Sequence, residues 1–221
     1  MRELFPPAKT NAVTHVYTPV HKVIDLGHSY GLDLDHDGII DFTLVNSMTC
    51  GTDVCIWRLV EKPANDNGVM ATNLMGNILA AALRKGARIP SGRFYRQVAY
   101  LAWSATLRRA PDEHGNWVDV NNRYLGLKFH IKGKVHYGWA RLNVHFQGHA
   151  VVGVLTGFAY ESVSNKAIIA GATKGPDDGE PTTSFNTHPP EAAMLGMLAL
   201  GAPGLSIWRR EELVAATPER N

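Results

Sequence analysis

The chain has 221 residues, of which 45% are hydrophobic and 19% are charged, and its formal net charge is +2. This length suffices for one domain with a sizeable core. The 22 lysine and arginine residues form no tract longer than a pair, so the sequence does not indicate a nucleic-acid-binding protein. Glycine (21 residues) and proline (12 residues) recur together with threonine and valine, which favours a mainly β fold.

The range 1–25 is polar and interrupted by proline, and it predicts an extended lead-in that contains a first edge strand. The segment Met1–Pro7 shows no apolar stretch of the kind found in a signal peptide. The range 26–173 then carries the strand and turn signals that predict the folded domain.

The range 33–42 has the sequence Asp-Leu-Asp-His-Asp-Gly-Ile-Ile-Asp-Phe, in which carboxylates recur around one glycine. A hard divalent cation such as Ca2+ binds about six to eight oxygen atoms, and Gly38 permits the sharp turn that makes them converge. Four carboxylates this close together repel one another unless a cation is present. The predicted Ca2+ ligands are the side chains of Asp33, Asp35, Asp37 and Asp41 and the carbonyl group of Ile39.

The same spacing occurs in EF-hands, in integrin-type propeller repeats, and in thrombospondin-like and dockerin-like repeats. An EF-hand needs a helix on each side and a glutamate at the twelfth loop position, where this chain has Leu44. Phe42–Val45 instead predicts a strand, so we expect the ion at the start of a β-sheet. The alternative is a solvated acidic turn without a metal.

The two cysteines, Cys50 and Cys55, are spaced to form a disulfide at the tip of a β-hairpin. Alternating apolar residues over 40–47 and 54–60 predict the two strands of that hairpin. The alternative is a pair of free thiols in a reducing compartment. A disulfide beside a calcium loop favours a secreted or cell-surface location.

Asn77–Gly86 predicts one short accessory helix. Asn77 suits the first position, apolar residues share one face, Lys85 suits the carbonyl end, and Gly86 suits the left-handed stop. Val98–Trp103 predicts a further strand or buried segment.

The range 124–161 carries the strongest β pattern and predicts three antiparallel strands. A tight turn at Lys132–Gly133 places His130 opposite Val135 and Phe129 opposite His136. The resulting sheet has one aliphatic face and one mixed aromatic face, and both faces need covering. We therefore predict an antiparallel β-sandwich.

A polar linker over 174–190 leads to an apolar C-terminal tail over 191–221, for which we expect helical and irregular structure. The apolar run Met194–Trp208 is shorter than the ~20 residues that span a bilayer, and Pro203 interrupts it. We expect no membrane span. The tail is either a sorting address or a segment that packs against its own sheet or that of a second copy.

Three segments, Tyr124–Phe129, His136–Arg141 and Thr156–Glu161, resemble a family of uncharacterised secreted bacterial proteins. In that family a Tyr-Gly-Trp motif precedes Gly-Tyr-Ala-Tyr-Glu and a C-terminal sorting tail. The range 189–193, the apolar run and Arg209-Arg210 look like a degenerate PEP-CTERM sorting signal. The resemblance spans roughly residues 30–210 and implies export, but it supplies neither fold nor activity.

Tyr124, Tyr137 and Trp139, together with Trp103, are candidates for an aromatic platform that binds a sugar ring, although such residues are more often core. The ten histidines show no spacing that predicts a metal site. No Gly-x-Ser-x-Gly or His-Glu-x-x-His motif is present in the sequence.

We therefore predict an exported, calcium-stabilised structural protein that serves as a cell-surface, matrix or fibre subunit, self-associates and has no enzymatic activity. The first alternative is a carbohydrate-binding module that recognises a polysaccharide, and the second is a calcium-dependent hydrolase. Structural assembly predicts an open sheet edge, sugar binding predicts an exposed aromatic groove, and hydrolysis predicts a cleft with convergent histidine and aspartate.

Overall fold

The computed structural model describes residues 14–106 and 112–174. Within these ranges the chain forms fourteen strands and no helix, so the protein is mainly β. The strands are β1 (His15–Ile24), β2 (Ser29–Leu32), β3 (Phe42–Cys50), β4 (Cys55–Pro63), β5 (Gly68–Leu74), β6 (Asn77–Ala80), β7 (Arg88–Ile89), β8 (Phe94–Tyr95), β9 (Ala99–Ala105), β10 (Asp112–His114), β11 (Val120–Ile131), β12 (Lys134–Gln147), β13 (Ala150–Glu161) and β14 (Ile168–Ile169).

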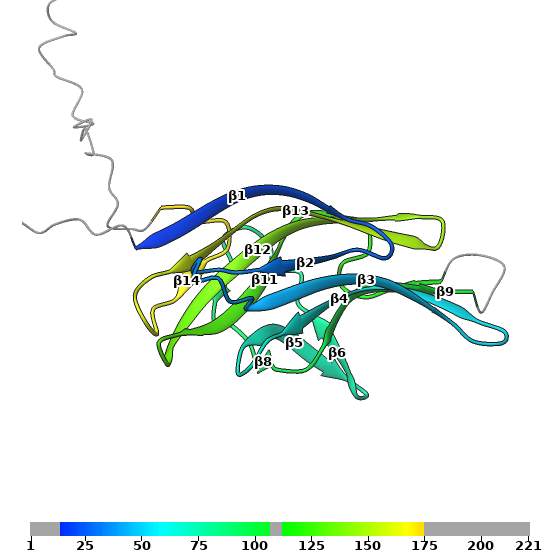
Figure 1. Cartoon of the computed structure of the whole chain (residues 1–221), viewed down its shortest axis with the longest axis horizontal. Coiled ribbons are helices and arrows are strands. Elements are labelled where there is room, and N and C mark those ends of the chain that lie inside the picture. Colours follow the sequence, from blue (N-terminus) through cyan, green and yellow to red (C-terminus); the bar gives the residue numbers. More distant parts are fainter. Residues whose placement is uncertain (1–13, 107–111, 175–221) are drawn as a thin grey trace, which may run out of the picture. The chain divides into compact units, whose positions relative to one another are not determined.

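Twelve of these strands form one sheet, in the order β1-β13-β12-β11-β5-β6-β9-β4-β3-β2, with β10 paired to β9 and β8 paired to β5 (Figure 1). Its strand pairs are antiparallel except for β6 with β9. β7 and β14 form a separate antiparallel pair.

β5 connects the two halves of this sheet. Gly68 and Val69 pair with β11, whereas the range from Ala71 to Leu74 pairs with β6. Across the interior β13 contacts β3, β4 and β9, so the half that contains β13 faces the half that contains β4. A large hydrophobic core lies between the halves.

The core consists of inward-facing side chains that alternate with outward-facing ones along each strand. Phe42, Phe129 and Trp117 are among its largest wholly buried members. Asn46 of β3 crosses this core, because its Nδ2 donates hydrogen bonds to the carbonyl oxygens of Ile24 on β1 (3.0 Å) and Val151 on β13 (2.6 Å). This amide ties the two halves of the sheet together.

A second, smaller core covers the outer face of β11–β13. Tyr124 and Trp139 meet edge to face with ring centroids 5.2 Å apart, and Trp139 Nε1 donates to the carbonyl oxygen of Ala172 at 3.2 Å. Ile89 of β7 and Ile168 of β14 are wholly buried against these rings. The β7–β14 pair therefore shields the aromatic face of the meander from solvent.

Two glutamates lie wholly buried in this fold. Glu161 Oε2 lies 3.2 Å from His15 Nε2 and 3.3 Å from Lys166 Nζ, and its Oε1 accepts the N–H of Val163 at 2.9 Å. Glu61 of β4 has no hydrogen-bond partner for either carboxyl oxygen among the described residues. Burial raises the pKa of Glu61 well above 4.5.

The predicted three-stranded meander is confirmed. β11, β12 and β13 pair antiparallel, the turn falls at Lys132–Gly133, and His130 lies opposite Val135 while Phe129 lies opposite His136. Both turn residues have positive φ (49° and 77°), a conformation that glycine adopts easily and that suits a two-residue hairpin turn.

The predicted accessory helix over Asn77–Gly86 is wrong. Its first four residues form β6, which pairs with β5 through a turn at Met75–Gly76, where φ is 50° and 90°. Asn73 stabilises this turn, because its Oδ1 accepts the N–H of Gly76 at 2.9 Å. Farther along, Leu83 forms an isolated bridge with Tyr124. Hydrogen bonds to neighbouring strands thus override the local helix propensity of the segment.

The predicted domain boundary at residue 26 is also wrong, because β1 pairs along its length with β13 and belongs to the sheet. The edge strand predicted within this range is confirmed as β1, which stands at one end of the strand order and belongs to the domain. The predicted tail over 191–221, and all of the predicted linker over 174–190 except Lys174, lie outside the described residues.

Candidate metal site

The acidic loop connects β2 to β3. Asp33 organises it, because its carboxylate accepts the backbone N–H groups of Asp37 at 3.2 Å and of Gly38 at 2.9 Å. Asp37 Oδ1 in turn accepts the N–H of Ile39 at 2.8 Å. Gly38 has a φ of 89°, a left-handed conformation that strains most other residues. These bonds wrap the backbone around the aspartate side chains.

His36, at the centre of the loop, anchors it to the sheet. Its φ of 61° turns the chain, and its Nε2 lies 2.8 Å from Thr18 Oγ1 on β1. The imidazole also packs near the ring of Phe158 on β13, with centroids 6.0 Å apart. The acidic loop is thus attached to two strands that are distant from it in sequence.

Asp33, Asp35 and Asp37 each offer one carboxylate oxygen, and these three oxygens lie within 4.8 Å of one another. Two ligands of one Ca2+ ion at ~2.3–2.6 Å from it are separated by no more than about 5 Å, so the three oxygens fit one ion. Burial raises the pKa of Asp35, and the nearby carboxylates of Asp37 and Asp33 raise it further. A bound cation would relieve this repulsion.

Asp41 lies outside this trio. Its Oδ2 accepts the backbone N–H of Leu34 at 2.9 Å, and its Oδ1 accepts a hydrogen bond from Asn67 Nδ2 at 3.1 Å. Burial raises the pKa of Asp41 to about 6, although these two hydrogen bonds lower it. Asp41 therefore braces the base of the loop, and its coordination of an ion stays a prediction. The same is true of the Ile39 carbonyl group.

A polar cavity of about 470 Å³ adjoins the loop. It is lined by Asp37, Ile39, Asp41, Asn65, Asp66, Asn67, His130 and Gly133. Asn67 links its two sides, because it bonds to Asp41 and its Oδ1 lies 3.5 Å from His130 Nδ1. Sequence reasoning missed Asn67, which is 26 positions from Asp41 and has no spacing signal.

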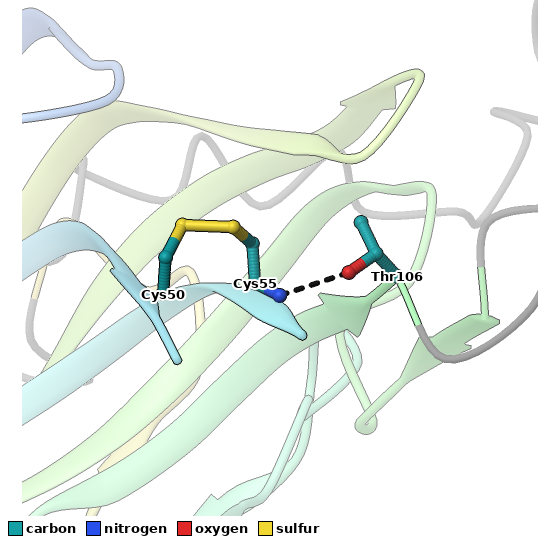
Figure 2. Close-up of a disulfide and its surroundings, with 3 residues drawn as sticks. All are labelled: Cys50, Cys55 and Thr106. Atoms are coloured by element: carbon teal, nitrogen blue, oxygen red, sulfur yellow. Dashed lines mark hydrogen bonds between the residues drawn. A yellow bond between two sulfur atoms is a disulfide. The ribbon is translucent and has the colours of Figure 1, made fainter. Parts of the chain in front are cut away.

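The predicted disulfide between Cys50 and Cys55 is confirmed, and it joins directly opposite residues at the ends of β3 and β4 (Figure 2). Beside it, the backbone N–H of Cys55 donates to Thr106 Oγ1 at 2.8 Å, which fastens the hairpin to the end of β9 (Figure 2). The bridge and the acidic loop share no residue.

The predicted aromatic platform is not assembled. Tyr124 is 3% exposed and Trp139 is wholly buried, because the β7–β14 pair covers both rings. Tyr137 is half-buried and packs against Phe94, with centroids 5.8 Å apart. These residues belong to the core, whereas Trp103 lines a separate groove on the surface.

Among the described residues, the aspartate trio is the one group of three or more side chains with metal-ligating atoms close enough to share an ion. His130 and His136 lie on adjacent strands, but His136 Nδ1 bonds to the carbonyl oxygen of Glu161 at 2.9 Å, while His130 contacts Asn67.

Comparisons of the chain with protein-family models, with curated proteins and with solved structures found no match. The resemblance to secreted bacterial proteins therefore stays a prediction. In the part of the chain that the structure describes, no helix has the length and apolar character needed to cross a bilayer.

Proposed function

We propose that the protein is an exported, calcium-stabilised β-sandwich that serves as a structural subunit of a cell surface, matrix or fibre. The observation that carries the proposal is the convergence of the Asp33, Asp35 and Asp37 carboxylates within 4.8 Å of one another. The loop that holds them lies at the junction of β2 and β3, so an ion bound there would stabilise the start of a core strand.

Calcium is the cation that best suits these ligands. The trio offers carboxylate oxygens only, which favours hard cations over zinc or copper. Mg2+ requires near-ideal octahedral geometry and releases its water reluctantly, whereas Ca2+ tolerates the irregular arrangement of a loop. Backbone carbonyl groups, such as that of Ile39, and water would complete the coordination shell.

Two further features support an extracytoplasmic, structural role. The Cys50–Cys55 disulfide is typical of proteins that fold in an oxidising compartment. β1 and β2 stand at the ends of the strand order, so each has one edge without a strand partner among the described residues. Next to β2, Ile39 (61% exposed) and Ile40 (43% exposed) present apolar side chains to solvent, which suits contact with a second copy.

Thermal unfolding of the full chain with chelator, with Ca2+ and with Mg2+ tests the ion. Free Ca2+ at about 100 times its Kd would stabilise the fold by about 2.7 kcal/mol, which for a chain of this size raises the Tm by about 5–10 °C. Mg2+ at the same concentration should have a smaller effect.

The variant Asp35→Asn makes this test sharper, because its effect on stability should change sign when the ion is added. In chelator it should be at least as stable as the wild type, since it removes one of three repelling charges, whereas in Ca2+ it should be less stable. Asp53→Asn is the matched control, because Asp53 is an exposed aspartate in the disulfide loop. A melting temperature that changes neither with chelator nor with Ca2+ contradicts the proposal.

A further inference from the structure

A groove of about 200 Å³ lies on the outer side of β4 and β9. Its lining residues are Ile56, Arg58, Asn77, Tyr100 and Trp103. None of them belongs to the acidic loop or to the cavity beside it. The groove combines aromatic rings, one guanidinium group and one amide, a combination suited to a ligand with both apolar and polar surfaces.

A β-bulge creates the aromatic side of the groove. Tyr100 and Trp103 are three residues apart, which would place them on opposite faces of a regular strand. The register of β4 with β9 shifts between Leu59 and Val60, and this shift leaves Leu101 as the extra residue. The bulge turns both rings to the same face, where their centroids lie 5.7 Å apart, edge to face.

Neighbouring side chains hold the rings in position. His114 of β10 stacks on Trp103, with centroids 5.2 Å apart and an interplanar angle of 25°. Because His114 stacks on the indole and Tyr100 packs against it, Trp103 has little freedom to rotate. An aromatic surface that is fixed before a ligand arrives loses little conformational entropy on binding.

Arg58 lies opposite Trp103 in the strand ladder. Its Nη2 donates to Thr49 Oγ1 at 2.7 Å, and its Nε lies 3.4 Å from Ser47 Oγ. Both partners are neutral hydroxyl groups, and no carboxylate forms an ion pair with Arg58 among the described residues. The guanidinium is therefore held in place with its positive charge uncompensated and with further N–H donors left for a ligand.

We propose that this groove binds a saccharide that carries a carboxylate, such as a uronic acid unit of an acidic polysaccharide. The aromatic rings of Tyr100 and Trp103 offer apolar surface to the C–H groups of a sugar ring. The planar guanidinium group of Arg58 matches the geometry of a carboxylate, which can accept two parallel hydrogen bonds from it. The Asn77 amide can bond to a hydroxyl group. The volume suits one or two rings of a longer chain that runs across the surface.

Titration calorimetry of the full chain with oligogalacturonate and oligoglucuronate, beside a neutral cello-oligosaccharide of equal length, tests this proposal. We expect binding of an acidic ligand, weaker binding at high salt, and a smaller affinity for the neutral one. Arg58→Gln should weaken binding of the acidic ligand about tenfold or more and remove the preference for it. Trp103→Ala should weaken binding of either ligand by a similar factor, and Trp103→Phe, which keeps a ring, should have a smaller effect.

Trp57→Ala is the matched control. Trp57 adjoins Arg58 on β4 but stacks on His149, with centroids 5.0 Å apart, and does not line the groove. Its removal should leave the affinity unchanged, and far-UV circular dichroism should show that all variants remain folded. Absence of binding to both acidic ligands overturns the proposal. So does a neutral ligand that binds as tightly as the acidic ones, or an affinity that neither Arg58→Gln nor Trp103→Ala alters.

Discussion

Glu61 should make the stability of the protein depend on pH. Its side chain is wholly buried, and on β4 the residue lies opposite Leu44 of β3 and Ala99 of β9 in the strand ladder. No described side chain or backbone group bonds to either of its oxygens, and burial raises its pKa well above 4.5. The folded protein thus keeps a proton that the unfolded chain releases near pH 4.5.

The direction of the pH dependence follows from the raised pKa of Glu61. The contribution of Glu61 to stability is fully present below pH 4.5 and is lost as the pH rises through the folded pKa. Between these limits the free energy of unfolding falls by about 1.4 kcal/mol per pH unit. Because the carboxyl group can remain protonated in the folded protein, keeping it from ionising costs no more than the free energy of protonating an ionised glutamate in water. At pH 7 this limit is about 3 kcal/mol.

The variant Glu61→Gln keeps the shape of the side chain and removes the titration. We expect urea denaturation in chelator to show that the wild type loses stability relative to Glu61→Gln between about pH 5 and about pH 7, by at most about 3 kcal/mol. Asp41, whose pKa is raised to about 6, also lowers the stability as the pH rises. Its contribution is the same in the wild type and in Glu61→Gln, so it cancels when their free energies of unfolding are subtracted.

Glu113→Gln is the control, because this glutamate lies on β10 and is not wholly buried. Its pH profile should run parallel to that of the wild type. If the profile of Glu61→Gln also runs parallel to the wild type, then Glu61 does not titrate between folded and unfolded states, and the reasoning from its burial is refuted.

Two further predictions concern the disulfide and the β2 edge. Replacing Cys50 and Cys55 together by serine should lower the free energy of unfolding by about 2 kcal/mol in denaturant titrations, since the closed loop is short; an unchanged value would show that the bridge does not constrain the unfolded chain. In sedimentation velocity with Ca2+, the wild type should self-associate at micromolar concentration and Ile39→Ser/Ile40→Ser should remain monomeric; a wild-type monomer would contradict the proposed self-association.

Local patterns in the sequence predicted the elements whose geometry is local. The alternation of β11–β13 and the turn at Lys132–Gly133 specify the register of the meander, because a slip of one residue would expose its whole apolar face. The Cys50–Cys55 bridge closes a hairpin between adjacent strands. The Asp33, Asp35 and Asp37 carboxylates lie within one loop, so their spacing alone brings them together.

The features that sequence reasoning missed depend on distant partners. Asn77–Ala80 has a helical apolar spacing, and only its pairing with β5 makes it a strand. The bulge at Leu101 has no glycine or proline to mark it, yet it determines which aromatic residues reach the surface. Tyr124 and Trp139 are covered by the β7–β14 pair, a contact that no local pattern indicates.

The pairing of β1 with β13 affects how the chain can fold as it is synthesised. His15 lies opposite Glu161, so the first long strand of the sheet finds its partner only after nearly all of the described chain has left the ribosome. Contacts this distant in sequence place the protein among slow-folding topologies, with folding times of about milliseconds to seconds. Until β13 arrives, β1 remains an open strand with which other chains can pair.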